Sequence, residues 1–276
     1  MRMVASDLDG TVVRPDGTIS PRTLAALAAC VERDVDVVFV TGRPTRWMAP
    51  IARATGHHGL AVCGNGAVVY DLGAERVVRA RTLDADAVRT VVQRLRAVMP
   101  AAAFALETVD GYRREPGFSV RDEPVDGVLT AGLEELLADG PEVVKVLCRD
   151  ETSTADPMLL LARAEMAGVA EPVHSGPLGC MIEISAAGVS KASTLEDLAR
   201  DRGVGAADVV AFGDMPNDVP MLLWAGRSFA MADGHPEAIE AAGGLAPPCE
   251  QDGVAQVLEA LLRELPQTSP GTDRPA

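Results

Sequence analysis

The sequence of 276 residues predicts an α/β protein, a doubly wound parallel sheet with a second, α+β domain inserted into it. Two observations predict this. Short apolar runs alternate with helical segments in the first third and again in the last third, a pattern typical of parallel strands buried on both faces. Between them lie about a hundred residues, enough chain for a domain, in which paired strands and helices follow turn-rich sequence.

The first third starts with a predicted strand at residues 4–7. A helix follows, because Ser20 can cap it and Pro21 suits its first position. It is expected to end near Arg33. The remaining elements expected there are strands at 35–40, 60–63, 67–70 and 76–79, and a helix at 44–55 that Gly56 ends.

The last third again alternates strands with helices, whereas the middle of the chain does not. The elements expected in the last third are helices at 190–202, 216–225, 236–242 and 254–264 and strands at 209–212 and 228–231. Those expected in the middle are helices at 84–98, 129–138 and 157–167 and strands at 104–108, 112–115, 143–148 and 181–185. The Pro-, Ser- and Thr-rich residues 266–276 are expected to be disordered.

The composition excludes several classes of partner. A net charge of −15 and a pI near 4.7 argue against nucleic acids and anionic membranes. No apolar run approaches the roughly 18 residues of a membrane span, and no signal-peptide pattern precedes the first strand. The five cysteines are scattered and form no CxxC motif, which favours small core residues in a reducing cytoplasm. We therefore expect a cytoplasmic protein with neither nucleic acid nor a membrane as its partner. We also expect a monomer or weak homo-oligomer.

The first strand ends in a group of polar residues. Asp7 and Asp9 are two apart, so in an extended chain they point to the same side. Two close carboxylates repel unless a proton or a cation lies between them. Gly10 permits a sharp turn, and Thr11 adds a hydroxyl. Taken alone, this could be only a strand followed by an Asp-Gly turn.

Polar residues also follow the other predicted strands. In parallel α/β sheets ligands bind outside the carboxyl ends of the strands, so these residues are expected to converge there. They are Thr41, Gly42 and Arg43 after the second strand, Asn65 after the third, and Asp214, Asn217 and Asp218 after the strand at 209–212. Each group has a plain alternative, a helix cap or a solvated turn.

Lysine is rare in this chain, which has 23 arginines and only two lysines, Lys145 and Lys191. Ammonium and guanidinium groups differ in shape and hydration, so a retained lysine indicates a specific need. Lys191 starts the helix before the strand at 209–212 and could join the cluster. Carboxylates, hydroxyls and an ammonium in one place predict a Mg²⁺ site beside a phosphate site.

These motifs resemble the haloacid dehalogenase superfamily of phosphatases, in particular its Cof-like group with a large α+β cap of type IIB. The matching segments are residues 7–11, 40–43, 188–191 and 213–218, with 65–67 also fitting. Ala192, and Asp233 with Gly234, depart from the group's usual pattern. The likeness covers about residues 1–82 and 186–260 and is vague between them. It implies a Rossmann-like catalytic core at 1–82 and 186–265 and a cap domain at 83–185.

The resemblance also implies roles for individual residues. Asp7 attacks phosphorus and forms an aspartyl-phosphate, and Asp9 acts as general acid and then as general base. Mg²⁺ is held by Asp7, the Asp9 backbone carbonyl and Asp214. Thr41, Gly42, Lys191 and Asn217 bind the phosphoryl group, and Thr11, Arg43, Asn65 and Asp218 support the site.

The expected function is thus Mg²⁺-dependent hydrolysis of small phosphomonoesters such as sugar phosphates. Two alternatives stay open: a phosphomutase that returns the phosphoryl group to a sugar, and a binding protein with a vestigial site. The cap is expected to close over the site and to set specificity, with Arg113, Arg114 and Arg121 as candidate contacts to the leaving group. Lys145 is expected to lie away from the site, so that Lys145→Arg would be nearly silent.

Overall fold

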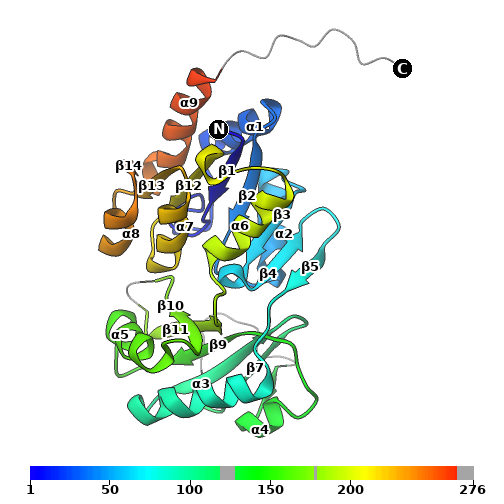
Figure 1. The fold of residues 1–276 in the computed structure, drawn as a ribbon, viewed down its shortest axis with the longest axis vertical. Coiled ribbons are helices and arrows are strands. Elements are labelled where there is room, and N and C mark those ends of the chain that lie inside the picture. The colour runs from blue at the N-terminus through cyan, green and yellow to red at the C-terminus, as the bar shows by residue number, and fades with distance from the viewer. Residues whose placement is uncertain (119–127, 177–178, 266–276) are drawn as a thin grey trace.

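The structure is a computed structural model that describes residues 1–118, 128–176 and 179–265. Its two lobes are stacked along the long axis of the molecule (Figure 1). The core lobe is built on an eight-stranded sheet from both ends of the chain, and the cap lobe on a six-stranded sheet from the middle. The predicted fold class, a doubly wound sheet with an inserted α+β segment, is confirmed. The predicted domain boundaries stay a prediction.

The core sheet places the first strand near its centre. Its strands are β1 (Met3–Ser6), β2 (Asp36–Val40), β3 (Leu60–Cys63), β4 (Val68–Asp71), β5 (Arg76–Ala80), β12 (Val209–Gly213), β13 (Arg227–Met231) and β14 (Gly244–Ala246). They lie in the order β14-β13-β12-β1-β2-β3-β4-β5, and the pairs from β14 to β3 are parallel. β4 and β5 add antiparallel strands at one edge. The carboxyl end of β1 therefore lies between those of β2 and β12.

Helices cover both faces of the core sheet. α1 (Pro21–Glu32), α2 (Met48–Thr55) and α9 (Gly253–Glu264) pack on the face that carries Val4 and Phe39. α6 (Lys191–Asp201), α7 (Val219–Trp224) and α8 (Pro236–Ala241) pack on the face that carries Met3 and Ala5. Successive strand residues point to opposite faces, so both sides of each apolar run are buried.

The predicted core elements are present with shifted ends. The helix expected at 44–55 is divided into a 3₁₀ turn, η1 (Thr45–Trp47), and α2, and that at 216–225 into η4 (Pro216–Asp218) and α7. The other 3₁₀ turns are η2 (Gly64–Gly66), η3 (Ala206–Asp208) and η5 (Cys249–Gln251). Strand β14 was not expected. Residues 266–276 lie outside the described part of the chain.

The cap lobe is an antiparallel sheet with helices on one face. Its strands are β6 (Ala103–Thr108), β7 (Tyr112–Arg114), β8 (Leu129–Thr130), β9 (Val143–Arg149), β10 (Ala170–Val173) and β11 (Met181–Ala186), and its helices α3 (Ala85–Val98), α4 (Leu133–Leu136) and α5 (Ala155–Met166). The strand order is β10-β11-β9-β6-β7-β8, antiparallel except for the β7–β8 pair. Helices α3 and α5 bury Phe104, Leu106 and Ile184 beneath them.

The prediction of a helix over residues 129–138 is wrong. Leu129–Thr130 pairs with β7 as a strand, and the helix α4 spans only Leu133–Leu136 after Gly132. The edge strand β10 was also missed. Within the described residues, no helix is both long and apolar enough to cross a lipid bilayer.

Candidate active site

Three carboxylates and one ammonium group lie together at the carboxyl end of β1. Asp7 follows β1 directly, and Asp214 and Asp218 follow the neighbouring parallel strand β12. Oxygens of these three carboxylates lie within 4.8 Å of one another. Lys191 Nζ donates to Asp7 Oδ1 at 2.5 Å and to Asp218 Oδ1 at 2.6 Å. One buried ammonium group therefore faces three carboxylates.

The local backbone holds this cluster in place. Asp218 Oδ2 accepts the backbone N–H groups of Asp214 and Met215, each at 3.0 Å, so both of its oxygens are engaged. Thr11 donates its hydroxyl to Asp214 Oδ1 at 3.1 Å. Gly10 has φ +81°, and a Cβ there would lie 2.4 Å from Asp214 Oδ2. Glycine is thus required both by the backbone conformation and by the close approach of Asp214.

Burial and mutual repulsion raise the pKa of two of the carboxyl groups. Loss of hydration, with repulsion from Asp218 and Asp9, raises the pKa of Asp7 to about 7 although Lys191 opposes the change. Burial and the charges of Asp7 and Asp218 raise the pKa of Asp214 to about 9. Burial disfavours the charged form of Lys191, but Asp218 and Asp7 outweigh it and raise the pKa of its ammonium group. The cluster therefore has an excess of negative charge that a divalent cation would balance.

Asp9 does not share this environment. Arg43 Nε donates to Asp9 Oδ2 at 2.7 Å, and Arg43 Nη2 also bonds Asp9 Oδ1. The Asp9 side chain is half exposed. The Arg43 backbone N–H donates to the hydroxyl of Thr41 at 3.0 Å, so the turn after β2 carries both the phosphate-site candidate Thr41 and the residue that holds Asp9.

Asn65 connects the two lobes. It has a left-handed backbone (φ +57°), which asparagine tolerates better than most residues. Its Oδ1 accepts from Asn217 Nδ2 at 3.0 Å, and its Nδ2 donates to Glu183 Oε2 at 3.0 Å. A Cβ on the next residue, Gly66, would lie 2.1 Å from Ser190 O, so this loop packs directly against the start of α6. Asn217 is thus bonded to Asn65, and its Oδ1 is buried without a partner among the described residues.

A cavity of about 190 Å³ lies between the lobes at this place. Five of the site residues predicted from the sequence line this cavity: Asp7, Asp9, Gly42, Arg43 and Asn217. The other predicted site residues do not line the cavity: Thr11, Thr41, Asn65, Lys191, Asp214 and Asp218. The predicted site residues are therefore one connected group, of which the nucleophile and acid–base candidates reach the cavity.

The cap wall of the cavity contains residues that the sequence argument missed. They are Glu107, Tyr112, Lys145, Leu147, Ser175, Met181 and Glu183. The expectation that Lys145 lies away from the motifs is wrong: it is 4% exposed, and its Nζ donates to Gly42 O at 2.9 Å and also bonds Glu183. The signal was present in the sequence. Residues 182–185 alternate apolar and polar side chains, and Lys145 stands in an apolar strand.

The candidate arginines of the cap lie elsewhere. Arg113 pairs with Asp139, and Arg114 donates to Phe118 O at 3.2 Å. Neither lines the cavity between the lobes. Arg121 lies outside the described residues.

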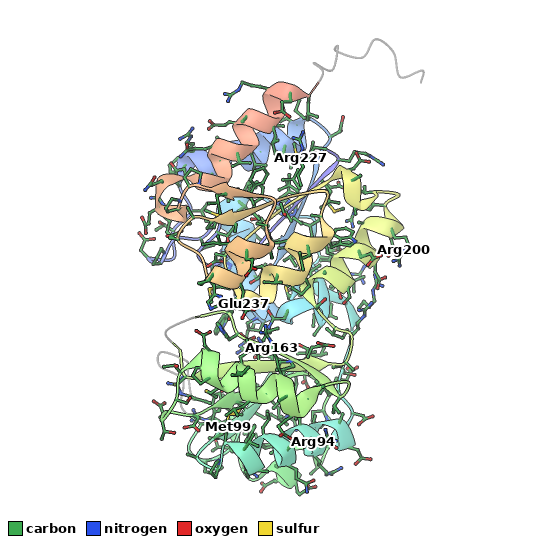
Figure 2. All side chains as sticks on the ribbon, turned by 60° about the vertical axis from the view of Figure 1, so that its left-hand side comes forward. Arg94, Met99, Arg163, Arg200, Arg227 and Glu237 are labelled. Carbon is green, nitrogen blue, oxygen red and sulfur yellow. The ribbon has the colours of Figure 1, made fainter. Side chains whose placement is uncertain are left out.

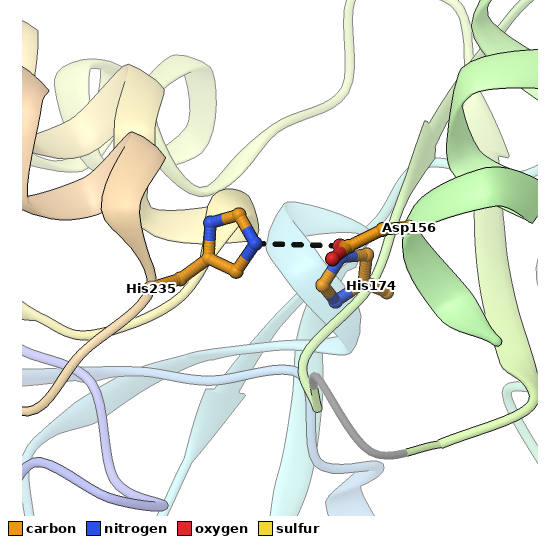
Figure 3. Close-up of side chains that lie close together, drawn as sticks. All are labelled: Asp156, His174 and His235. Atoms are coloured by element: carbon orange, nitrogen blue, oxygen red, sulfur yellow. Dashed lines mark hydrogen bonds and ion pairs between the residues drawn. The ribbon is translucent and has the colours of Figure 1, made fainter.

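A second contact joins the lobes at α5 and α8. Figure 3 shows Asp156 of α5 beside His174, which follows β10, and facing His235, the N-cap residue of α8. Asp156 Oδ1 lies 2.7 Å from His174 Nε2 and 3.3 Å from His235 Nε2. Arg163 and Glu237 face each other beside it, at 3.1 Å (Figure 2).

This triad has ligand types that could hold a metal ion. However, His235 Nδ1 accepts the backbone N–H of Glu237 at 3.2 Å, which places the ring proton on Nε2. An Nε2 that carries a proton donates to a carboxylate and has no lone pair for a metal. We therefore assign the triad as a hydrogen-bonded contact between the lobes.

Comparisons with known proteins agree with the fold and the motifs. The profile of the haloacid dehalogenase-like hydrolases matches residues 4–258. An HMP-PP phosphatase of Serratia proteamaculans is 30% identical over 95% of this chain and 96% of its own length. One from Escherichia coli (strain K12 / DH10B) is 28% identical over 86% of each.

Solved structures show the same fold. A haloalkanoate-superfamily phosphatase from Bacteroides thetaiotaomicron superposes with a TM-score of 0.77 at 22% identity, covering 94% of each chain. A sugar phosphatase of subclass IIB gives a TM-score of 0.80 at 19% identity, covering 95% of this chain and 99% of its own.

Proposed function

The chain belongs to the haloacid dehalogenase-like hydrolases and is a phosphatase of small phosphorylated compounds, and we propose that it uses Mg²⁺ and an aspartyl-phosphate on Asp7. The observation that carries the proposal is the charge of the buried cluster. Three carboxylates face one ammonium group at the edge of a cavity. Such an excess of buried negative charge is costly unless a cation offsets it.

The residues present fit a magnesium ion. Asp7 and Asp214 would hold it, since both oxygens of Asp218 are engaged by Lys191 and by the backbone. Carboxylate oxygens with water are the ligands that Mg²⁺ takes in proteins. A bound Mg²⁺ would neutralise the cluster and polarise the phosphoryl oxygens.

The chain's own residues would carry the reaction in two steps. In the first, an Asp7 oxygen bonds to phosphorus, the bond from phosphorus to the leaving oxygen breaks, and Asp9 gives its proton to that oxygen. In the second, Asp9 removes a proton from water, which attacks phosphorus and releases phosphate from Asp7. Arg43 holds both Asp9 oxygens, so protonation of Asp9 requires this ion pair to open.

Lys191 would stabilise the phosphoryl group from behind the nucleophile. Its ammonium group is fixed between Asp7 and Asp218 and is shielded from solvent. Preorganised donors in a water-poor site contribute more than they would in water. Thr41, Gly42 and Asn217 lie on the neighbouring turns and are the proposed partners of the remaining phosphoryl oxygens.

The size of the cavity supports a small substrate. About 190 Å³ accommodates a phosphoryl group with a compact leaving group. The matched relatives include HMP-PP phosphatases and a sugar phosphatase, so HMP-PP and sugar phosphates are the substrates we propose to test first.

Phosphate release from a panel of these compounds tests the proposal. We expect release that needs Mg²⁺, stops in EDTA and returns when Mg²⁺ is restored. Product analysis should show the free alcohol or lower phosphate and no phosphate moved within the sugar, which separates a phosphatase from a mutase. Full activity after rigorous metal removal, or no activity on any compound, contradicts the proposal.

A further inference from the structure

The cap strands that face the core carry polar side chains at alternate positions. Glu107 of β6 is directly opposite Lys145 of β9, and Glu183 of β11 lies diagonally from Lys145. The intervening residues, such as Val146 and Ile184, pack beneath the cap helices. One face of this sheet is therefore the hydrophobic core of the cap. The other face, directed at the cavity, carries the charged side chains of Glu107, Lys145 and Glu183 beside the apolar Leu147 and Met181.

Lys145 and Glu183 form the centre of that surface. Each side chain is 5% exposed, and the two form a short ion pair. Glu183 Oε1 accepts the hydroxyl of Ser175 at 2.7 Å, and its Oε2 accepts both Lys145 and Asn65. The carboxylate thus already has three donors. Lys145 Nζ likewise has two acceptors, Gly42 O and Glu183 Oε2. Groups that are already bonded to several protein partners suit the positioning of neighbouring loops.

The pair reaches two loops of the core lobe. Lys145 Nζ donates to Gly42 O, between Thr41 and Arg43, and Glu183 accepts from Asn65, which in turn holds Asn217. A continuous chain of hydrogen bonds therefore runs from the cap to the turns after β2, β3 and β12. These are the turns to which we assign phosphate binding and the orientation of Asp9.

We propose that Lys145 and Glu183 are positioning residues, which dock the cap on the Gly42 and Asn65 loops and thereby set the geometry of the phosphate side of the site. The inference rests on the proposed phosphatase function. When the lobes are together, Gly42 O and Asn65 Nδ2 add hydrogen bonds to this buried pair. The cap consequently selects one arrangement of these loops, because a misaligned approach would leave buried polar groups unpaired.

Three variants test the pair: Lys145→Met, Glu183→Gln and the two combined. Lys145→Met alone leaves a buried carboxylate without its cation and could unfold the cap, so the double variant, which has neither charge, keeps the test valid. Arg113→Met with Asp139→Asn is the control, a more exposed ion pair of the cap outside the cavity lining. Thermal melting shows which variants are folded.

The readouts separate positioning from substrate recognition and from plain stability. For folded variants we expect kcat/KM to fall at least about tenfold by the same factor for p-nitrophenyl phosphate and for a sugar phosphate. We expect the affinity for inorganic phosphate with Mg²⁺, measured by calorimetry, to fall too. The kcat/KM of the double variant should be no lower than that of the less active single variant, because the two residues act as a unit.

Two results would overturn the inference. A loss confined to one leaving group would make the pair a specificity subsite, and a loss no greater than that of the control would make it merely structural. Calorimetry with inorganic phosphate does not depend on turnover. An inactive wild-type protein would therefore reject the proposed function, while unchanged phosphate affinity in the variants would reject the positioning role.

Discussion

The two lysines of this chain lie in buried clusters that differ in their balance of charge. Lys191, in the core lobe, faces the three carboxylates of Asp7, Asp214 and Asp218. Lys145, in the cap lobe, forms an ion pair with Glu183, and both oxygens of that carboxylate accept hydrogen bonds. Uncompensated charge marks the place where a cation and a reacting group are needed, and compensated charge marks a place where geometry is fixed. Four predictions test this difference between the two clusters.

The largest effect is expected from Asp7→Asn. An amide is a poor nucleophile, so turnover should fall by at least about 1,000-fold. The same change removes a charge from the overcrowded cluster, so the metal-free variant should melt at a temperature equal to or above that of the wild type. Steady-state kinetics and thermal melting measure the two quantities. Residual activity within tenfold of the wild type would remove Asp7 from the role of nucleophile.

Arginine substitutions at the two lysines come next. Lys191→Arg should lower kcat/KM at least tenfold, equivalent to about 1.4 kcal/mol, because a planar guanidinium does not fit between Asp7 and Asp218. Lys145→Arg should lower kcat/KM less, by about threefold. The change is not silent, because Lys145 donates to Gly42 O and forms a buried ion pair with Glu183. Equal effects at both sites would contradict the distinction between the two clusters.

A smaller effect concerns stability and pH in the metal-free protein. The pKa of Asp7 is raised from 3.8 to about 7 in the folded protein. The protonated carboxyl group therefore adds to the free energy of unfolding, fully below pH 3.8, and this contribution is lost as the pH rises through 7. The melting temperature of Asp7→Asn minus that of the wild type should therefore grow by about 3 °C between pH 6 and 8. Burial lowers the pKa of His57 and His174, and these contributions cancel in the difference. Asp214 contributes to the difference, because the charge of Asp7 helps to raise the pKa of Asp214. A difference that does not change with pH would show that Asp7 titrates normally.

The smallest effect is expected at the contact between α5 and α8. The Asp156 side chain is 57% exposed, so Asp156→Asn should cost less than about 1 kcal/mol and leave kcat/KM within twofold. It should nevertheless loosen the cap, which hydrogen exchange at the connections near Leu83 and Ala187 would detect. Loss of activity comparable to that of the Lys145 variants would mean that this contact also positions the site.

The core lobe could be predicted because its chemistry and its topology coincide. Parallel strands bring their carboxyl ends together, so polar residues after several apolar runs must converge, and Asp7, Asp214 and Lys191 do so. No such rule relates the loops of the cap. The partners of Lys145 depend on the register of β9 with β11 and on how the two lobes meet, and neither is encoded locally.

Missed elements in both lobes have local causes. Strand β10 contains Pro172 and lies at a sheet edge, where proline is tolerated but the strand pattern is broken. Strand β14 has three residues, and β8 has two, too few to show any period. The prediction of one helix over 129–138 was wrong because the strand β8 ends before Gly132, and a single helical turn, α4, begins after it.

The central place of β1 has a consequence for synthesis on the ribosome. One of its two neighbours, β2, follows it closely in the chain, yet the other, β12, is made some two hundred residues after it. The six strands of the cap sheet, by contrast, come from one continuous stretch of chain. The growing polypeptide therefore carries an unpaired edge on β1 throughout the time in which the cap is made, and such an edge can pair with another chain. Conditions that slow elongation after residue 186 should increase aggregation of the nascent protein more than those that slow it before residue 85.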